Sequence, residues 1–232
     1  NGAFDCCDMP KIELPDTLVT IGDQAFSNND TLQEIIIPEG VETIGTWAFA
    51  ACDSLSRVSV SASVKAMNSN PFCINPSLAE INVDPENPYY CSIDNNIYSK
   101  DHKTLYAVPG IMQDRYTVSD TVAVIADYAF YSHKRIIRVE IPESVETIGK
   151  HAFMSSEIKS VNFPECVTNV EYGSFICPCI HKELMMAELG ETDEAYDPMC
   201  GDGQLLSVFA DSVKKYGQEI DPQQLENARA RL

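Results

Sequence analysis

The sequence has few basic residues and a large excess of acidic ones. Lysine and arginine total 16 of 232 residues, aspartate and glutamate total 35, and the formal net charge at pH 7 is −19. A protein that holds a nucleic-acid backbone over a broad surface needs clustered lysine and arginine, so this balance argues against that function for the chain as it stands. A solvated acidic surface is the simpler meaning of the charge.

Long hydrophobic runs and an amino-terminal signal pattern are also absent. No stretch approaches the roughly 18 apolar residues of a membrane-spanning helix, and the first residue is Asn1 rather than a methionine. The sequence therefore predicts no membrane partner and a cytoplasmic location. Display at the cell surface is the alternative if a signal is missing from the amino terminus.

The chain lacks paired cysteines and paired catalytic side chains. Its nine cysteines are an odd number without a C-x-x-C pair, which favours free, partly buried thiols over a disulfide framework. Cys177, Cys179 and His181 lie too close together for the usual zinc spacing, so we predict no metal site. His102, His133 and His151 lie far apart in register, and we interpret each as a satisfied surface or core histidine rather than a catalytic base.

What the chain does have is an internal repeat. Phe26, Phe49 and Phe72 are spaced by 23 residues, Phe130 and Phe153 by 23 again, and Phe175 follows after 22. A short sequence motif recurs in the same register, as in Val41-Glu-Thr-Ile-Gly45 and Val145-Glu-Thr-Ile-Gly149. A fixed period of this length is typical of a solenoid built from stacked coils.

Short alternating runs precede the proline, or its substitute, of most coils. They are rich in β-branched residues, which predicts short strands with one face directed inward: residues 35–37, 58–60, 81–83, 139–141 and 161–163. The Ala-Phe pair of each coil is expected to pack its ring under the strand of that coil. Since no coil can bury its apolar face alone, the coils should stack into a continuous ladder of parallel strands.

This pattern resembles the leucine-rich repeats of the BspA type, over about residues 12–175. The resemblance implies a repeat domain at 1–175 that acts as an interaction scaffold for an unknown protein partner. It also implies an irregular hairpin insertion near 87–110, with turns at 94–96 and 100–103. Five tyrosines, interpreted either as an exposed contact surface or as core, are Tyr89, Tyr90, Tyr98, Tyr106 and Tyr131.

Residues 176–232 follow a different pattern. A helix at 180–189 is expected to lead into a strand at 195–197, a glycine turn, a helix at 204–210, a strand at 215–220 and a last helix. A glycine turn between strand and helix lets a ligand approach the backbone closely. Glu219, 16 residues beyond Gly203, ends the second strand where an acidic residue can accept ribose hydroxyls. An ordinary turn between a strand and a helix is the alternative.

The wording Tyr196-Asp-Pro-Met-Cys-Gly-Asp-Gly203 resembles the start of adenine-specific DNA methyltransferases, closest to the modification subunits of type I restriction systems. The resemblance implies that S-adenosylmethionine would contact Asp197, Pro198, Cys200, Gly201, Gly203, Glu219 and Ile220. No residue is assigned a catalytic role, because the family's Asn-Pro-Pro-Tyr/Phe motif is missing. Asn70 and Asn87 begin short segments that are similar to this motif, and their positions in the repeat explain both segments. The chain alone is therefore expected to bind the cofactor weakly or not at all, and to meet DNA only through parts it lacks.

The predicted fold class is α/β: a leucine-rich-repeat solenoid at 1–175, then the first βαβα part of a Rossmann-like methyltransferase fold at 176–232. The first functional hypothesis is an interaction scaffold fused to the cofactor-binding start of a bacterial DNA-methylating enzyme. The alternative is a non-enzymatic interaction or surface-adhesion module whose carboxy-terminal segment is an α/β cap.

Overall fold

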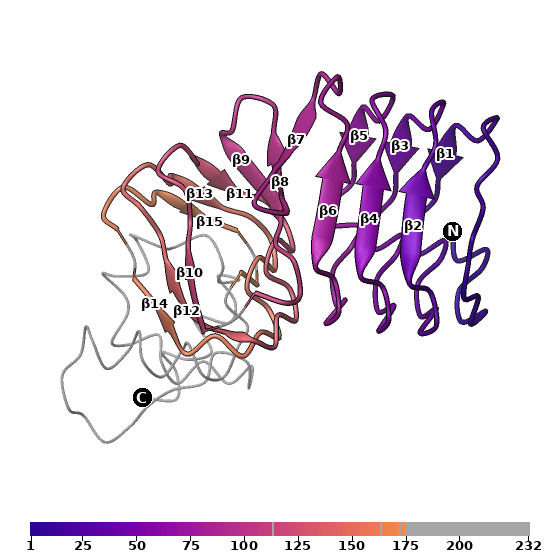
Figure 1. The fold of residues 1–232 in the computed structure, drawn as a ribbon. Helices are drawn as coiled ribbons and strands as arrows, with labels where there is room; N and C mark the ends of the chain where they lie inside the picture. The colour runs from indigo at the N-terminus through magenta and orange to yellow at the C-terminus, as the bar shows by residue number, and fades with distance from the viewer. Residues whose placement is uncertain (113, 163, 172, 175–232) are drawn as a thin grey trace, which may run out of the picture.

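The computed structural model describes residues 1–174 with the exception of 113, 163 and 172. Within these residues the regular structure is all β, with no helix (Figure 1). Each regular coil contributes two strands. The six two-residue strands of the short-strand sheets are β1 (Thr20–Ile21), β3 (Thr43–Ile44), β5 (Ala66–Met67), β11 (Val124–Ile125), β13 (Thr147–Ile148) and β15 (Asn169–Val170).

The second strand of each coil belongs to one of two other sheets. The first long-strand sheet has the order β2-β4-β6, with β2 at Glu34–Ile37, β4 at Arg57–Val60 and β6 at Glu80–Val83. The second long-strand sheet has the order β10-β12-β14, with β10 at Asp114–Thr117, β12 at Ile136–Glu140 and β14 at Ser160–Val161. All pairings in these two sheets are parallel.

Strand alternation explains how the repeat builds its core. In β4, Val58 and Val60 are buried while Arg57 is exposed and Ser59 half-buried. Because β2, β4 and β6 pair in 23-residue register, inward-facing valines and isoleucines of successive coils lie beside one another. The predicted solenoid with a parallel ladder is thereby confirmed.

The glycines of two Ile-Gly pairs, Gly45 and Gly149, are required by a close approach between coils. A Cβ added at Gly45 would lie 2.4 Å from the backbone nitrogen of Asp23 in the preceding coil. The carboxylate of that aspartate accepts a hydrogen bond of 2.9 Å from the backbone N–H of Thr46. Gly149 and Asp127 repeat the arrangement in the second half. Glycine at these two positions therefore lets a coil contact the aspartate of the coil before it.

The phenylalanines stack on one another along the solenoid. Ring centroids are 5.3 Å apart for Phe26–Phe49, 5.8 Å for Phe49–Phe72 and 4.8 Å for Phe130–Phe153. The repeated ring therefore stabilises contacts between neighbouring coils through stacking, a relation beyond the packing within one coil that the sequence predicted.

A polar residue at the turn after each ring satisfies buried backbone groups. The amide of Asn75 donates to the carbonyls of Phe49 and Phe72, each at 2.9 Å, and its oxygen accepts from the backbone N–H of Cys52 at 2.7 Å. Residues at this position share the 23-residue spacing within each half: Asn29, Cys52, Asn75, then His133 and Ser156. This register explains why a thiol and a histidine lie in the core.

The hairpin at 90–107 divides the solenoid into two stacks. Strands β7 (Tyr90–Ile93), β8 (Asn96–Ser99) and β9 (Thr104–Ala107) pair antiparallel, and the chain reverses where the sequence predicted two turns. Ile97 packs in the core of the first stack, whereas Tyr98 and Leu105 pack in the core of the second. The hairpin, which lies between the two groups of strands in Figure 1, is thus a wall shared by two hydrophobic cores.

Side-chain hydroxyls of β7 cap the ladders that end at this wall. The hydroxyl of Tyr90 accepts a hydrogen bond of 2.9 Å from the backbone N–H of Met67 in β5. The hydroxyl of Ser92 accepts one of 3.1 Å from Val83 in β6. The sequence predicted one continuous ladder of parallel strands. The structure instead interrupts the ladder, because the hairpin occupies the place of a regular coil.

Candidate functional site

A groove crosses the outer face of the first long-strand sheet and ends at the hairpin. It has a volume of about 800 Å³. Its floor is a row of paired outward residues, Ile36, Ser59 and Asn82, one from each strand. Ile36 is 63% exposed, the highest value among the large hydrophobic residues that the structure describes as exposed. An exposed apolar residue beside small polar ones is a surface suited to contact with another molecule.

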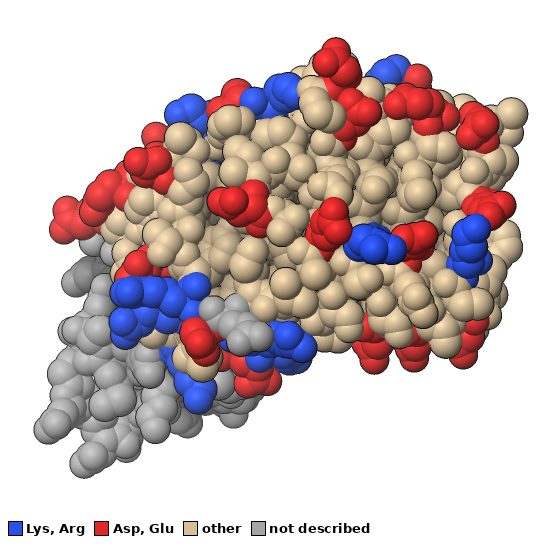
Figure 2. All heavy atoms as spheres, in the orientation of Figure 1, with Lys and Arg blue, Asp and Glu red and all other residues tan. Residues whose placement is uncertain are grey.

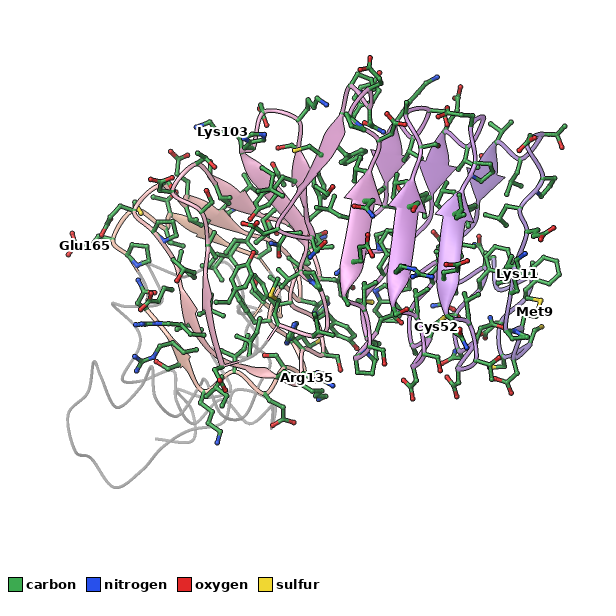
Figure 3. All side chains as sticks on the ribbon, viewed as in Figure 1. Met9, Lys11, Cys52, Lys103, Arg135 and Glu165 are labelled. Carbon is green, nitrogen blue, oxygen red and sulfur yellow. The ribbon has the colours of Figure 1, made fainter. Side chains whose placement is uncertain are left out.

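A row of alternating charge runs along the same sheet. Glu34, Arg57 and Glu80 occupy paired positions, and the Arg57 guanidinium lies 2.6 Å from the Glu34 carboxylate. Lys11, one period earlier, forms an ion pair of 2.6 Å with Glu13, and the hydrogen bond that its ammonium donates to this carboxylate raises the pKa of the lysine. Figure 3 labels Lys11 at the outer end of the sheet. These charges are mutually compensated, so the groove is edged by a nearly neutral row.

The hairpin forms the far wall of the groove. Cys91, Ser92 and Lys100 line it, and the Lys100 ammonium donates a hydrogen bond of 2.8 Å to the carbonyl of Pro85. Partial burial raises the pKa of the Cys91 thiol, which keeps that thiol protonated at neutral pH. The wall therefore offers a positive charge held by the backbone, and no activated nucleophile.

A second, smaller hollow of about 220 Å³ lies where the two stacks meet. Beside it, the chain's only tryptophan, Trp47, packs against Tyr128 and Tyr131 of the second stack, with ring centroids 5.4 Å apart in each pair. Asn70 also crosses this junction, donating a hydrogen bond of 3.2 Å to the Tyr128 carbonyl. We define these four residues as the seam; they hold one stack against the other.

Two polar side chains that could suggest a catalytic role, Asn87 and His133, form hydrogen bonds that stabilise the fold. The amide of Asn87 donates to Ser61 and Val64 and accepts from the N–H groups of Tyr89 and Tyr90, all at 2.8–2.9 Å. His133 is buried and bonds the Pro109 carbonyl through Nε2 at 2.9 Å. Both residues therefore serve the fold, and the prediction of a satisfied core histidine is confirmed for His133.

The buried thiols are poor nucleophiles. Burial raises the pKa of Cys52 to about 11, and burial also raises the pKa of Cys73 above its ordinary value. All six cysteines in the described part of the chain are free. Across residues 1–174, apart from the three gaps, no three His, Cys, Asp or Glu side chains gather in a way that could hold a metal ion.

Two further outcomes concern membranes and the tyrosines. None of the residues that the structure describes belongs to a helix long and apolar enough to cross a bilayer.

Tyr90 and Tyr98 are buried, so the interpretation as core is confirmed for these two, whereas Tyr89 is exposed at 48%. The hairpin is covered on both faces, which the sequence analysis missed: Tyr90 packs in the core of the first stack and Tyr98 in that of the second.

The cofactor residues predicted from the second resemblance lie outside the described residues. This applies to Asp197, Pro198, Cys200, Gly201, Gly203, Glu219 and Ile220, and to the helices and strands expected in 176–232.

The stacked coils, the two short strand ladders and the outward groove define a repeat-protein scaffold. A profile of the BspA type leucine rich repeat region matches residues 1–107 and 112–193 in six copies. The chain therefore belongs to the BspA type leucine-rich-repeat family. No curated protein matches the chain.

Solved structures agree on the fold. The pneumococcal vaccine antigen PcpA is 26% identical, with a TM-score of 0.55, over 68% of this chain and 45% of its own. A leucine-rich repeat protein from Eubacterium ventriosum is 20% identical, with a TM-score of 0.57, over 74% of this chain and 56% of its own. The chain thus spans about half the length of each of these proteins.

Proposed function

We propose that this chain is a non-catalytic interaction scaffold that binds a protein partner in the groove beside the hairpin. The observation that carries the proposal is the exposed Ile36 in line with Ser59 and Asn82, closed at one end by the hairpin wall. An apolar residue surrounded by small polar ones and rimmed by charges matches the anatomy of a protein interface. The occupied state of His133 and Asn87 supports a scaffold over an enzyme in this part of the chain.

Selection of peptides from a displayed random library tests the proposal and does not require the partner's identity. Binders selected on the wild-type chain should lose about tenfold or more in affinity when Ser59→Trp fills the groove floor, because the added indole occupies the contact surface. The matched control is Lys103→Glu, an exposed position away from the groove that Figure 3 labels. Binders that tolerate Ser59→Trp but lose affinity with the control would place the contact surface elsewhere.

A second candidate function concerns residues 176–232. We propose that they descend from the start of an adenine-specific DNA methyltransferase and hold S-adenosylmethionine through Asp197, Gly201, Gly203 and Glu219. The wording of 196–203 and the acidic residue 16 positions later support this. A function in DNA methylation or restriction-modification would belong to a longer protein that supplies the catalytic motif.

Calorimetric titration with S-adenosylhomocysteine tests this second candidate on the chain as given. Weak heat of binding that disappears in Glu219→Ala and Gly201→Leu is the expected result, since the first removes the ribose acceptor and the second places a side chain in the turn. Binding that survives both substitutions would remove these residues from the site.

The location of the protein also stays a prediction. A cytoplasmic chain with free thiols is the first interpretation, and display at a cell surface is the alternative.

A further inference from the structure

The second long-strand sheet carries two like charges in directly opposed positions. Arg115 of β10 pairs with Arg138 of β12 in the parallel register, so the two residues lie opposite each other in strands spaced by about 4.8 Å. Like charges opposite one another destabilise a sheet. The equivalent row of the first long-strand sheet avoids this arrangement by alternating Glu34, Arg57 and Glu80. The folded chain thus tolerates local electrostatic repulsion in the second long-strand sheet and avoids it in the first.

Only one of the two arginines is neutralised. Arg115 forms an ion pair with Glu140 in the same sheet. Among the described residues, no carboxylate lies within ion-pair distance of Arg138, which is exposed. Its guanidinium therefore presents its donors to solvent in the planar geometry that carboxylates bind in a bidentate manner.

A β-bulge places an apolar side chain beside this arginine. The register shifts between Asp114 and Arg115, which leaves Ile137 as the extra residue of β12. Ile137 is 44% exposed, although the residue before it and the residue two positions after it are buried. Bulges redirect side chains and are frequent beside functional sites. Lys159 follows in the next coil, its backbone N–H donating to the Ile137 carbonyl at 2.7 Å.

Positive charge gathers at this sheet in an otherwise acidic molecule. Five basic residues lie on β10, β12 and the segments leading into β12 and β14: Arg115, Lys134, Arg135, Arg138 and Lys159. Figure 2 shows basic side chains grouped over this end of the molecule, while acidic side chains and scattered basic ones lie along its other edges. Three acidic residues accompany them, Asp114, Glu140 and Glu157, so the excess of positive charge here is small and confined.

We propose that Ile137, Arg138 and Lys159 form a docking patch for a short acidic segment of a partner protein. An apolar residue of the segment would contact Ile137, and carboxylates on either side would bind Arg138 and Lys159. This patch lies on a different sheet from the groove, so the two proposals can be tested separately.

The size of the patch decides between classes of anionic partner. Three strands spaced by about 4.8 Å span roughly 10 Å, the width of a few residues of extended chain. A nucleic acid or a sulfated polysaccharide carries its charge far beyond that width and would run onto the acidic surface around the patch. A short segment with only a few carboxylates can stay within the width of the patch and bind Arg138 and Lys159.

Fluorescence anisotropy with a short synthetic peptide of repeated Glu-Leu-Glu units tests the proposal on the full chain. We expect Arg138→Glu and Lys159→Glu each to weaken binding by about tenfold. The same peptide with glutamine in place of glutamate should bind weakly to the wild type, and added salt should reduce binding of the acidic peptide. Ser59→Trp in the groove should leave this affinity unchanged, which separates the patch from the proposed function.

Lys103→Glu is the matched control, since it makes the same charge change at an exposed position away from the patch. Thermal unfolding provides a second readout, because Arg138→Glu removes the Arg115–Arg138 repulsion and should not lower the melting temperature. Loss of binding in a folded variant therefore supports the patch. Equal affinities of Arg138→Glu and Lys103→Glu for the peptide would overturn it, as would tighter binding of a heparin oligosaccharide or an oligonucleotide that depends on the same residues.

Discussion

At the scale of single residues, the core of this solenoid depends on polar side chains with a full set of partners. His133 is the clearest case. Its Nε2 bonds the Pro109 carbonyl, and its Nδ1 accepts from the backbone N–H of Ile136 at 3.3 Å. A ring that accepts at one nitrogen and donates at the other must be neutral.

Burial lowers the pKa of His133 below its ordinary value, and the positive charge of Arg135 acts in the same direction. The unfolded chain, with a histidine pKa of about 6.5, therefore takes up a proton first as the pH falls. This residue's stabilising contribution is fully present above about pH 6.5 and is lost as the pH falls from there towards the folded-state pKa.

Comparison of the wild type with His133→Gln by urea unfolding tests this linkage. Glutamine can donate and accept at similar positions but does not titrate. The free energy of unfolding of the wild type should fall more than that of the variant between about pH 7.5 and 5.5. Parallel pH dependences in the two proteins would contradict a buried, neutral His133.

Asn87 provides a second prediction at this scale. Asn87→Ala removes four hydrogen bonds and leaves buried carbonyls and N–H groups without partners, which should cost about 3 kcal/mol or more. Asn82→Ala is the matched control, because that amide is exposed and bonds only Glu80, so the change should stay within about 0.5 kcal/mol. Equal urea midpoints for the two variants would show that the Asn87 network is not formed.

At the scale of elements, the hairpin strands serve two cores at once. Ile97 and Leu105 are both fully buried, the first in the core of the first stack and the second in that of the other. Each truncation to alanine should cost about 2–5 kcal/mol through the cavity that it leaves.

Hydrogen exchange measured by mass spectrometry separates the two effects. Ile97→Ala should increase exchange mainly in β2, β4 and β6, and Leu105→Ala mainly in β11, β12 and β13, because stability in a solenoid is carried by nearest-neighbour contacts. Trp47 and Tyr128 couple the stacks at the seam, so Trp47→Ala should make the two halves exchange more independently. Uniform protection loss from either hairpin variant would mean that the stacks unfold as one unit.

The elements also show what the sequence could and could not predict. The alternating runs before each proline predicted β2, β4, β6, β12 and β14, because inward residues recur every 23 positions. Strands of two residues such as β1 and β3 carry no readable alternation, and β10 contains only one buried residue, Tyr116, so both kinds were missed. The seam was also missed, since Trp47 and Tyr128 are distant in sequence and meet only because the hairpin displaces a coil.

The groove had a partial signal in the sequence. Ile35, Ile36 and Ile37 form an apolar run in which alternation requires one side chain to face outward, and Ile36 is that residue. The hairpin wall followed from the resemblance, but its packing against β6 depends on contacts of Ser92 and Lys100 that no periodicity reveals.

At the scale of the whole molecule, acidic residues line up along one corner of the solenoid. The position after each proline, or its substitute, is acidic and exposed in five coils: Asp16, Glu39, Asp120, Glu143 and Glu165. In neighbouring coils these carboxylates occupy equivalent positions and repel one another, and salt screens that repulsion.

The melting temperature should therefore rise between about 0.02 M and 0.5 M sodium chloride. Replacing the two carboxylates that flank Glu143, in the double variant Asp120→Asn and Glu165→Gln, should raise the melting temperature at low salt and reduce the salt effect. Glu80→Gln is a control that should lower the melting temperature at low salt, because Glu80 lies beside the positive charge of Arg57 in the alternating row. A double variant that is less stable than the wild type at low salt would contradict the repulsion.

The 23-residue coil is also a unit of length under load. The two stacks lie one after the other with β1 and β15 towards opposite ends of the described part (Figure 1), so tension applied along the chain would reach the outermost of these coils first. Each coil that peels away releases about 80 Å of extended chain, at roughly 3.5 Å per residue. The hairpin, bonded across antiparallel strands and wedged between both cores, is where this regular sequence of steps would halt. Under load the described part would then lengthen in steps of one coil on either side of the hairpin, which would unfold last.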